Sequence, residues 1–163
     1  MKKVMLFMLL AVGAFSIACE AQVSPKATAD GKDVKVKYGQ PSKKGREIFG
    51  KLEPFGKVWR AGANEATEIT FAKDTKFGGQ TIKAGTYTLF ITPNPTEWTV
   101  ILNSELKQWG AFKYNEIKDK DVLKVTVPVK KLDAVVEKLT YRFDSKNALI
   151  VEWDQSQITV PIG

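Results

Sequence analysis

The sequence of 163 residues contains no histidine and a single cysteine, Cys19. A Ser-His-Asp triad and a histidine general base therefore cannot be built within this chain, and a Cys/His zinc site is equally excluded. Carboxylate chemistry is the catalytic class that such a sequence still allows, because two Asp or Glu side chains can hydrolyse a glycoside. The sequence brings no two carboxylates together. It therefore predicts no catalytic residue, no metal site and no cofactor, and it favours a binding protein over an enzyme.

Long hydrophobic runs are also scarce, and the clearest one lies near the N-terminus. Residues 4–15 form an apolar run of about 12 residues, whereas a transmembrane helix needs ~20. Lys2 and Lys3 precede this run, as the basic residues of a secretory signal do. We therefore predict that residues 1–21 form a signal peptide and that the mature protein lies in the periplasm or cell envelope.

The end of the predicted signal peptide allows two processing schemes. Cleavage after Ala21 leaves a soluble protein. Alternatively, the segment Ser16-Ile17-Ala18-Cys19 resembles a bacterial lipobox, with Ser16 where leucine is usual. Cys19 is then a lipidation candidate, and membrane attachment is expected only through that lipidated cysteine.

Basic residues outnumber acidic ones, with 25 Lys+Arg against 18 Asp+Glu and a net charge of +7. Removal of residues 1–21 takes away Lys2, Lys3 and Glu20, so 23 basic and 17 acidic residues remain, a net charge of +6. The lysines fall in separate turns, and no recognition-helix or aromatic RNA-binding motif is present. The charge is consistent with attraction to anionic lipids or other polyanions, and we expect no nucleic-acid partner.

Apolar and polar residues alternate in short runs along residues 33–163, as in residues 34–38 and 123–129. This period of two is typical of strands that bury one face. Gly78-Gly79 is a two-residue hairpin signal, and residues 98–102, which are apolar on both faces, predict a central strand. Short strands between turn signals predict an all-β fold, an antiparallel β-sandwich of about eight or nine strands, immunoglobulin-like or jelly-roll-like, forming a single domain over residues 33–163.

The remaining segments refine this architecture. Residues 22–32 combine Ser, Pro, Lys, Thr, Asp and Gly and predict a flexible tether. Residues 104–108 and 131–138 allow one or two short helices, although the second segment also alternates as a strand does. Pro128 indicates an edge strand or a bulge. The predicted core comprises Phe71, Tyr87, Leu89, Val100, Leu102, Val125, Val127, Tyr141, Phe143, Val151 and Trp153.

The loop region of residues 39–64 places polar and aromatic side chains between glycines, and such loops often bind ligands. The candidate ligand-binding residues are Arg46, Trp59, Arg60, Asn64 and Glu65. Arginine offers bidentate donors for an acid, and tryptophan offers a stacking face for a sugar. The alternative is structural: Trp59 fills the core and Arg60 forms an internal ion pair with Glu65. We expect Arg60, Asn64 and Glu65 to form one polar cluster at the mouth of the sandwich.

A second group of aromatic residues lies around Gly110. Trp109 and Tyr114, together with Phe112, are candidates for an aromatic binding platform. The alternative is that they pack in the core beneath a long loop.

Several segments resemble one bacterial family. They are Tyr38-Gly39-Gln40-Pro41, residues 44–50 (KGREIFG), residues 54–67 (PFGKVWRAGANEAT), residues 84–87 (AGTY) and residues 109–112 (WGAF). In these segments the sequence resembles the family catalogued as domain of unknown function 2911, which is typical of Bacteroidetes, over roughly residues 33–162. The resemblance implies an exported single β domain and carries over no catalytic or binding residue.

These observations predict an exported cell-envelope binding or interaction module, whose partner is a small molecule, a glycan or an envelope protein. The alternative is a carboxylate-dependent hydrolase that acts on envelope glycans.

Overall fold

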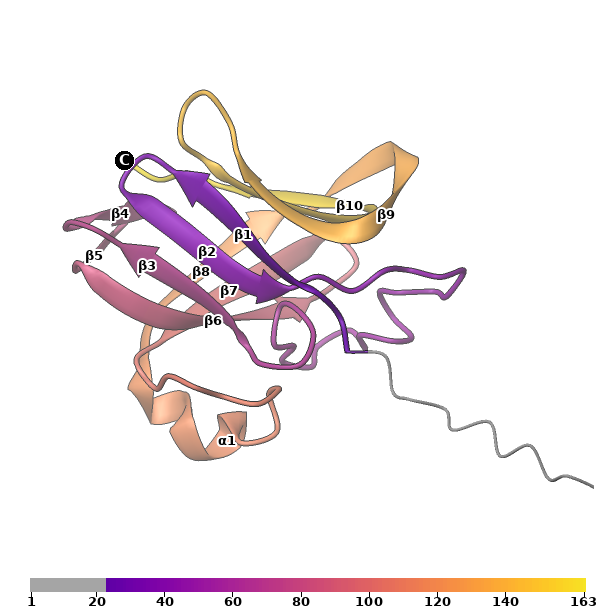
Figure 1. Ribbon diagram of the computed structural model, residues 1–163, viewed down its shortest axis with the longest axis horizontal. Helices are drawn as coiled ribbons and strands as arrows, with labels where there is room; N and C mark the ends of the chain where they lie inside the picture. The colour runs from indigo at the N-terminus through magenta and orange to yellow at the C-terminus, as the bar shows by residue number, and fades with distance from the viewer. Residues whose placement is uncertain (1–22) are drawn as a thin grey trace, which may run out of the picture.

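The computed structural model describes residues 23–163, so the predicted signal peptide and Cys19 lie outside the described residues. The described chain is mostly β-strand, and its elements are labelled in Figure 1. In chain order they are β1 (Lys26–Gly31), β2 (Val34–Gly39), β3 (Thr67–Phe71), β4 (Thr75–Phe77), β5 (Gln80–Ile82), β6 (Gly85–Pro93), β7 (Glu97–Asn103), α1 (Tyr114–Ile117), a 3-10 turn η1 (Lys118–Lys120), β8 (Asp121–Pro128), β9 (Lys130–Phe143) and β10 (Leu149–Val160).

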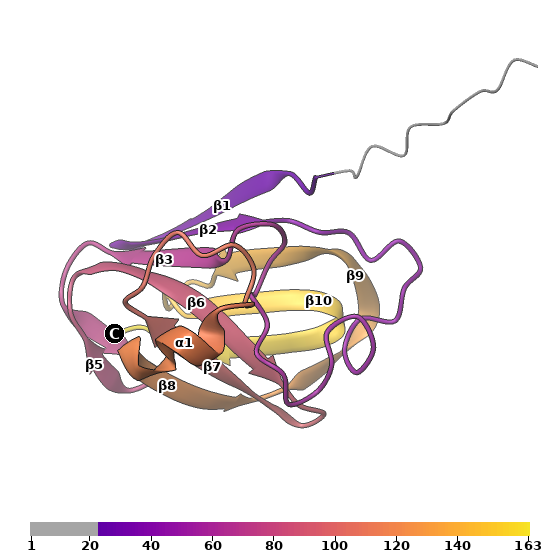
Figure 2. The same cartoon turned by 90° about the horizontal axis from the view of Figure 1, so that it is seen from below.

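The strands form a sandwich of two unequal layers. One layer is a six-stranded antiparallel sheet in the order β1-β2-β3-β6-β7-β8, and the other is the long hairpin β9–β10. Seen from below, the larger sheet curves around this hairpin, with β10 lying on its concave side (Figure 2). The short hairpin β4–β5 completes the described strands. The predicted antiparallel sandwich is therefore confirmed.

The core lies between the two layers and follows the alternation of the sequence. In β8, Leu123, Val125 and Val127 are buried while the residues between them are exposed or half-exposed. All eleven predicted core residues lie in the main core, nine of them buried and Tyr87 and Phe143 partly buried against it. Tyr38 and Tyr141 join the layers, with ring centroids 4.5 Å apart.

A second, smaller core lies on the outer face of the large sheet. Phe90 of β6 and Ile101 of β7 point outward and are covered by Tyr114 and Ile117 of α1. This cover explains why residues 98–102 are apolar on both faces, and it confirms that β7 is a central strand. It also holds residues 104–113 over the outside of the sheet.

Two details of the predicted architecture were wrong. Residues 26–31 of the predicted tether form β1, which pairs along its full length with β2 and raises the strand number to ten. The small residues of this strand, with only Ala29 buried, give little apolar alternation, so the pattern was missed. Residues 104–108 are not helical, and the short helix lies instead at residues 114–117. Of the two alternatives for residues 131–138, the strand is confirmed. Within residues 23–163, no helix is long and apolar enough to cross a membrane.

Other local predictions were confirmed. Gly78 and Gly79 form the turn between β4 and β5, and both have positive φ (57° and 82°), as a type I′ hairpin turn requires. Pro128 ends β8, which is an edge strand of the large sheet.

Candidate functional site

Trp59 lies in the core and not on a binding surface. It is 3% exposed, its ring stacks on Trp153 at a centroid distance of 5.9 Å, and Phe49 meets it edge-on at 6.0 Å. Its indole N–H donates to the carbonyl oxygen of Gly62 at 3.2 Å, so the polar atom is satisfied internally. This is the position that the structural alternative predicts for Trp59, and the residue presents no free face to a ligand.

Arg60, Asn64 and Glu65 lie close along the chain but do not form the expected cluster of side chains. Arg60 Nη1 donates to the backbone carbonyl of Asn64 at 3.2 Å, and its guanidinium lies 5.9 Å from the ring centroid of Phe112. Glu65 pairs with Lys26 at 2.9 Å and not with Arg60. The hydrogen bond from Lys26 lowers the pKa of the Glu65 carboxyl. The predicted ion pair between Arg60 and Glu65 is therefore wrong.

Arg46 is exposed and belongs to its own turn. Its guanidinium donates to the backbone carbonyls of Ser42 (2.7 Å) and Lys43 (3.0 Å). Nearby, the half-buried carboxyl of Glu53 has a pKa raised to about 7 because burial removes it from water, and the charges of Arg60 and Arg46 oppose that rise in part.

Trp109 and Tyr114 have opposite environments, so the predicted aromatic platform is divided. Tyr114 is 9% exposed, packs edge-on against Phe90, and donates its hydroxyl to Asp121 Oδ2 at 2.6 Å. Burial, with help from that hydrogen bond, raises the pKa of Tyr114. Trp109 is 62% exposed and is available to a ligand.

Trp109 forms one wall of a cleft of about 500 Å³ on the outer face of the large sheet. The floor is made by residues of β1, β2 and β3, and the wall that carries Trp109 is made by residues 107–109. The charged side chains that line the cleft are Lys26, Lys37, Glu65, Glu68 and Lys107, and Trp109 lies beside them. Of the seven predicted ligand-binding residues, this cleft brings together two, Glu65 and Trp109.

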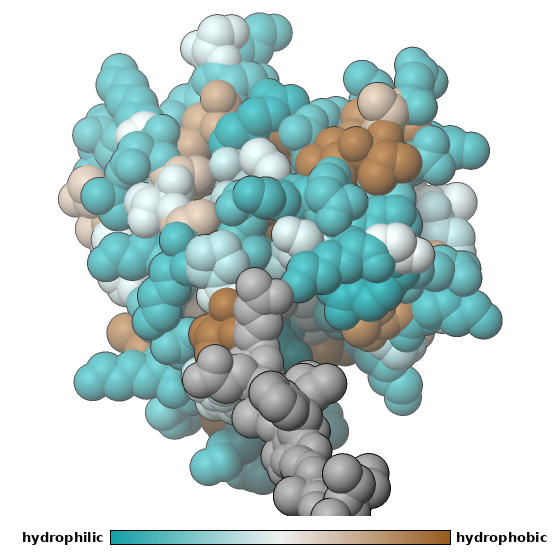
Figure 3. All heavy atoms as spheres, turned by 45° about the vertical axis from the view of Figure 1, so that its right-hand side comes forward, coloured by the Kyte–Doolittle hydropathy of each residue, from teal (hydrophilic) through white to brown (hydrophobic). Residues whose placement is uncertain are grey.

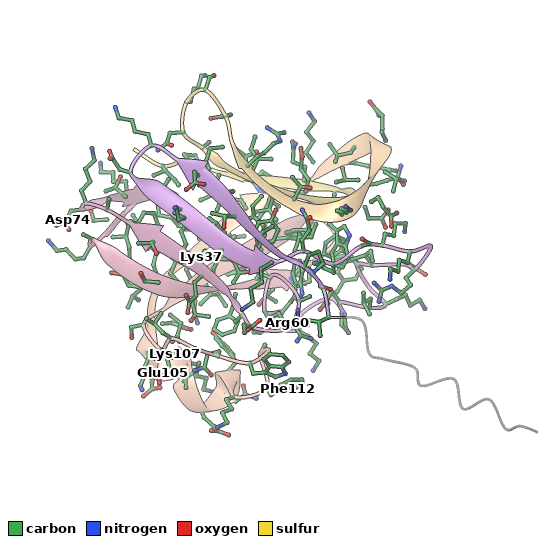
Figure 4. The ribbon with its side chains drawn as sticks, viewed as in Figure 1. Lys37, Arg60, Asp74, Glu105, Lys107 and Phe112 are labelled. Carbon is green, nitrogen blue, oxygen red and sulfur yellow. The ribbon has the colours of Figure 1, made fainter. Side chains whose placement is uncertain are left out.

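The floor of the cleft follows from the pairing of three strands. In β2, Tyr38 points into the core, so Lys37 points outward. Lys37 pairs with Thr28 of β1 on one side and with Glu68 of β3 on the other. The register therefore places a cation beside a carboxylate on the cleft floor, and Figure 4 shows Lys37 on β2 and Lys107 on the loop that precedes α1.

The wall that carries Trp109 is held by backbone hydrogen bonds. The N–H of Ala66 donates to the carbonyl of Gln108 at 2.8 Å, and the N–H of Gly110 donates to that of Asn64 at 3.1 Å. The N–H of Lys107 also reaches Glu68 Oε1 at 3.5 Å. These bonds lie on both sides of Trp109 and fix the position of its backbone against residues 64–66.

One glycine at the cleft permits a close approach of two segments. A Cβ on Gly39 would lie 2.0 Å from the backbone oxygen of Ala63, a distance that no side chain tolerates. Glycine therefore lets residues 61–64 cross the end of β2. This crossing brings Asn64 and Glu65 to the rim of the cleft.

Sequence reasoning missed four of the charged lining residues, Lys26, Lys37, Glu68 and Lys107. Alternation along β2 marks Lys37 as outward-facing, but the pairing register that sets it beside Glu68 is not contained in either segment alone. Lys26 was assigned to the tether, and Lys107 to a possible helix.

Comparison with known proteins identifies the family and no closer relative. Residues 20–162 match the family model described as Protein of unknown function (DUF2911), so the chain belongs to that family. No curated protein and no solved structure matches the chain.

Proposed function

We propose that this member of the DUF2911 family is an exported binding module of the cell envelope, and that its cleft takes a saccharide bearing an acidic group. The observation that carries the proposal is the exposed indole of Trp109 beside a cleft floor on which the strand register sets Lys37 next to Glu68. An indole face stacks on the apolar face of a sugar ring, and carboxylates and amides around it accept and donate hydrogen bonds to hydroxyl groups.

The size and charge of the cleft support the same ligand class. A volume of about 500 Å³ lies within the usual range of ~300–1,000 Å³ for small-molecule sites. Three lysines and two glutamates line it, and one lysine, Lys26, is already paired with Glu65. Lys37 and Lys107 are thus the cations that can meet an acidic substituent, because each offers a compact, strongly hydrated charge with three donors.

We favour binding over hydrolysis because of the charge state of one carboxyl in the cleft. A glycosidase requires one carboxyl group with a raised pKa to protonate the leaving oxygen. Glu65, which lines the cleft, has a lowered pKa because Lys26 donates to it. Glu53, whose pKa is raised by burial, does not line the cleft.

Export is part of the proposal and is supported by the sequence of residues 1–21. Mass spectrometry of the protein isolated from cells is expected to find an N-terminus at Cys19 or Gln22 in an extracytoplasmic fraction. An intact Met1 in the cytosol would contradict export.

The ligand is tested by thermal shift with paired neutral and uronic-acid oligosaccharides, because a ligand that binds the native state raises its melting temperature. We expect a shift with acidic sugars that falls strongly in Trp109→Ala and is retained in part by Trp109→Phe, which keeps an aromatic face. Lys37→Ala is expected to remove the preference for acidic over neutral sugars.

Lys35→Ala is the matched control for Lys37→Ala. Lys35 is also exposed on β2 but pairs with Asp30 at 3.0 Å and does not line the cleft, so its loss should leave binding unchanged. The proposal fails if no saccharide shifts the melting temperature, or if Trp109→Ala binds as the parent protein does.

A further inference from the structure

Two large aromatic side chains are exposed at one corner of the molecule. Trp109 is 62% exposed and Phe112 is 78% exposed, and both lie in the loop of residues 104–113. Val23, the first described residue, is 70% exposed. Isolated apolar residues on a surface are common, but two large aromatic rings three residues apart in one loop mark an interaction site.

Asn64 ties the aromatic loop to the start of the described chain. Its backbone carbonyl accepts hydrogen bonds from Gly110 N (3.1 Å) and Arg60 Nη1 (3.2 Å), while its side-chain nitrogen donates to the carbonyl of Ser24 (3.1 Å). Figure 4 shows Phe112 below Arg60, in agreement with the contact between the guanidinium and the ring. In the space-filling view, apolar atoms lie directly beside the start of the described chain (Figure 3). The three exposed residues Val23, Trp109 and Phe112 are called the aromatic corner below.

Lysines surround the aromatic corner. Lys107 and Lys113 flank the aromatic pair within the same loop, and both are exposed. Lys26 follows Val23 by three residues and is neutralised by Glu65. Exposed apolar side chains between two exposed lysines in one loop suit an anionic lipid surface. Aromatic rings lie at the headgroup level of a bilayer, and lysines attract acidic headgroups.

The chain that precedes Val23 points to the same partner. Cys19, the lipidation candidate, lies four residues before Val23, and four residues span at most ~14 Å. A lipid on Cys19 therefore keeps Val23 within that distance of the bilayer surface, and the bonds of Asn64 tie the next residue, Ser24, to the aromatic loop at Gly110. The docking contact then acts as a second attachment beside the anchor.

We propose that the aromatic corner docks on an anionic bilayer surface, with Trp109 and Phe112 at the headgroup level and Lys107 and Lys113 against acidic headgroups. This extends the expectation that membrane attachment runs only through Cys19. The proposal does not depend on the saccharide cleft, because Phe112 and Lys113 do not line it.

The test uses the mature full-length protein with Cys19→Ser, so that no lipid anchor masks the contact, and vesicles of equal parts phosphatidylethanolamine and phosphatidylglycerol. Three of the four tryptophans are buried, with exposures of 3% for Trp59, 1% for Trp98 and 1% for Trp153. A change in tryptophan emission on addition of vesicles therefore reports on Trp109. We expect a blue shift and quenching by brominated lipid.

Variants separate the aromatic from the electrostatic contribution. Trp109→Ala with Phe112→Ala is expected to reduce vesicle partitioning at least about tenfold, and Phe112→Leu, which stays apolar, to retain most of it. Lys113→Gln is expected to reduce partitioning about fivefold on phosphatidylglycerol vesicles and to change nothing on phosphatidylcholine vesicles. Val135→Ala, at a 52% exposed position on β9, is the matched control and is expected to bind as the parent does.

Three results would overturn the proposal. The first is unchanged tryptophan emission on addition of the phosphatidylglycerol-containing vesicles. The second is equal partitioning of the parent and the double alanine variant, both with unchanged melting temperature. The third concerns Lys37→Ala, which distinguishes this site from the cleft. It is expected to leave partitioning unchanged, and a loss as large as that of the double alanine variant would refute the corner as the docking surface.

Discussion

Replacement of Glu53 by glutamine should stabilise the protein at alkaline pH and have little effect in acid. The Glu53 carboxyl is half-buried, and burial raises its pKa from 4.5 to about 7. Arg60 and Arg46 oppose this rise but do not cancel it. Because glutamine is a neutral side chain of the same shape, it removes the cost of a buried charge and leaves the packing unchanged.

The sign and size of the effect follow from proton linkage. A carboxyl whose pKa is higher in the folded than in the unfolded state holds its proton more tightly when folded, so stability falls as pH rises through the interval between the two values. Here the interval runs from 4.5 to about 7. At about 1.4 kcal/mol per pKa unit, ionisation of Glu53 costs up to about 3 kcal/mol of unfolding free energy above that interval.

Urea denaturation of the parent and Glu53→Gln between about pH 4 and pH 8 measures this difference, and the other titrating groups cancel in the comparison. Glu152→Gln is the control of opposite sign, because Arg142 donates to Glu152 at 2.7 Å and lowers its pKa. The Glu152→Gln variant should be less stable than the parent near neutrality, and that deficit should shrink in acid. If the stabilities of the parent and Glu53→Gln stay parallel across the whole range, the carboxyl is not desolvated and the reasoning is refuted.

Two further predictions test the fold. Val127→Asp places a carboxylate in the core, where Val127 is 6% exposed. This substitution is expected to cost several kcal/mol of the ~5–15 kcal/mol free energy of unfolding that a domain has, so circular dichroism should find the variant largely unfolded. An unchanged melting temperature would contradict the register of β8. Gly78→Ala should destabilise more than Gly79→Ala, since a Cβ on Gly78 would lie 2.4 Å from Val125 Cγ1 while one on Gly79 meets nothing within 4 Å. Both positions have positive φ, so equal decreases in melting temperature would show that backbone strain, and not the contact with Val125, determines the cost of a side chain at these positions.

The proposed cleft and the proposed docking corner are neighbours, and the two proposals share Trp109 and Lys107. If both proposals hold, the cleft opens close to the bilayer to which the domain is docked, and an acidic saccharide carried by an envelope component is presented to it there. The two proposals fail separately, because Lys37 tests only the cleft and Phe112 tests only the corner.

Most of the fold could be predicted because it depends on local patterns. Alternation along residues 123–127 puts every second side chain into the core, and Gly78-Gly79 specifies a tight turn whatever surrounds it. The prediction missed β1, because a strand of small and polar residues gains its stability from hydrogen bonds to β2 and not from an apolar face of its own.

Much less of the site could be predicted, since exposure is decided by neighbours that are distant in sequence. Trp59 and Trp109 are the same residue type in similar glycine-containing loops, yet one stacks on Trp153 and the other stands 62% exposed. Glu65 forms its ion pair with Lys26, which is 39 residues away in the sequence, and not with Arg60, which is only five residues away.

The sequence by itself determined that residues 23–163 fold mainly into antiparallel strands and that the chain has no histidine chemistry, because composition and a period of two act within a few residues. Only the tertiary structure decided which charged and aromatic side chains meet. Strand register placed Lys37 beside Glu68, and the bonds of Asn64 joined Ser24 to the aromatic loop. These contacts depend on pairing between segments far apart in the sequence, and no local pattern specifies that pairing.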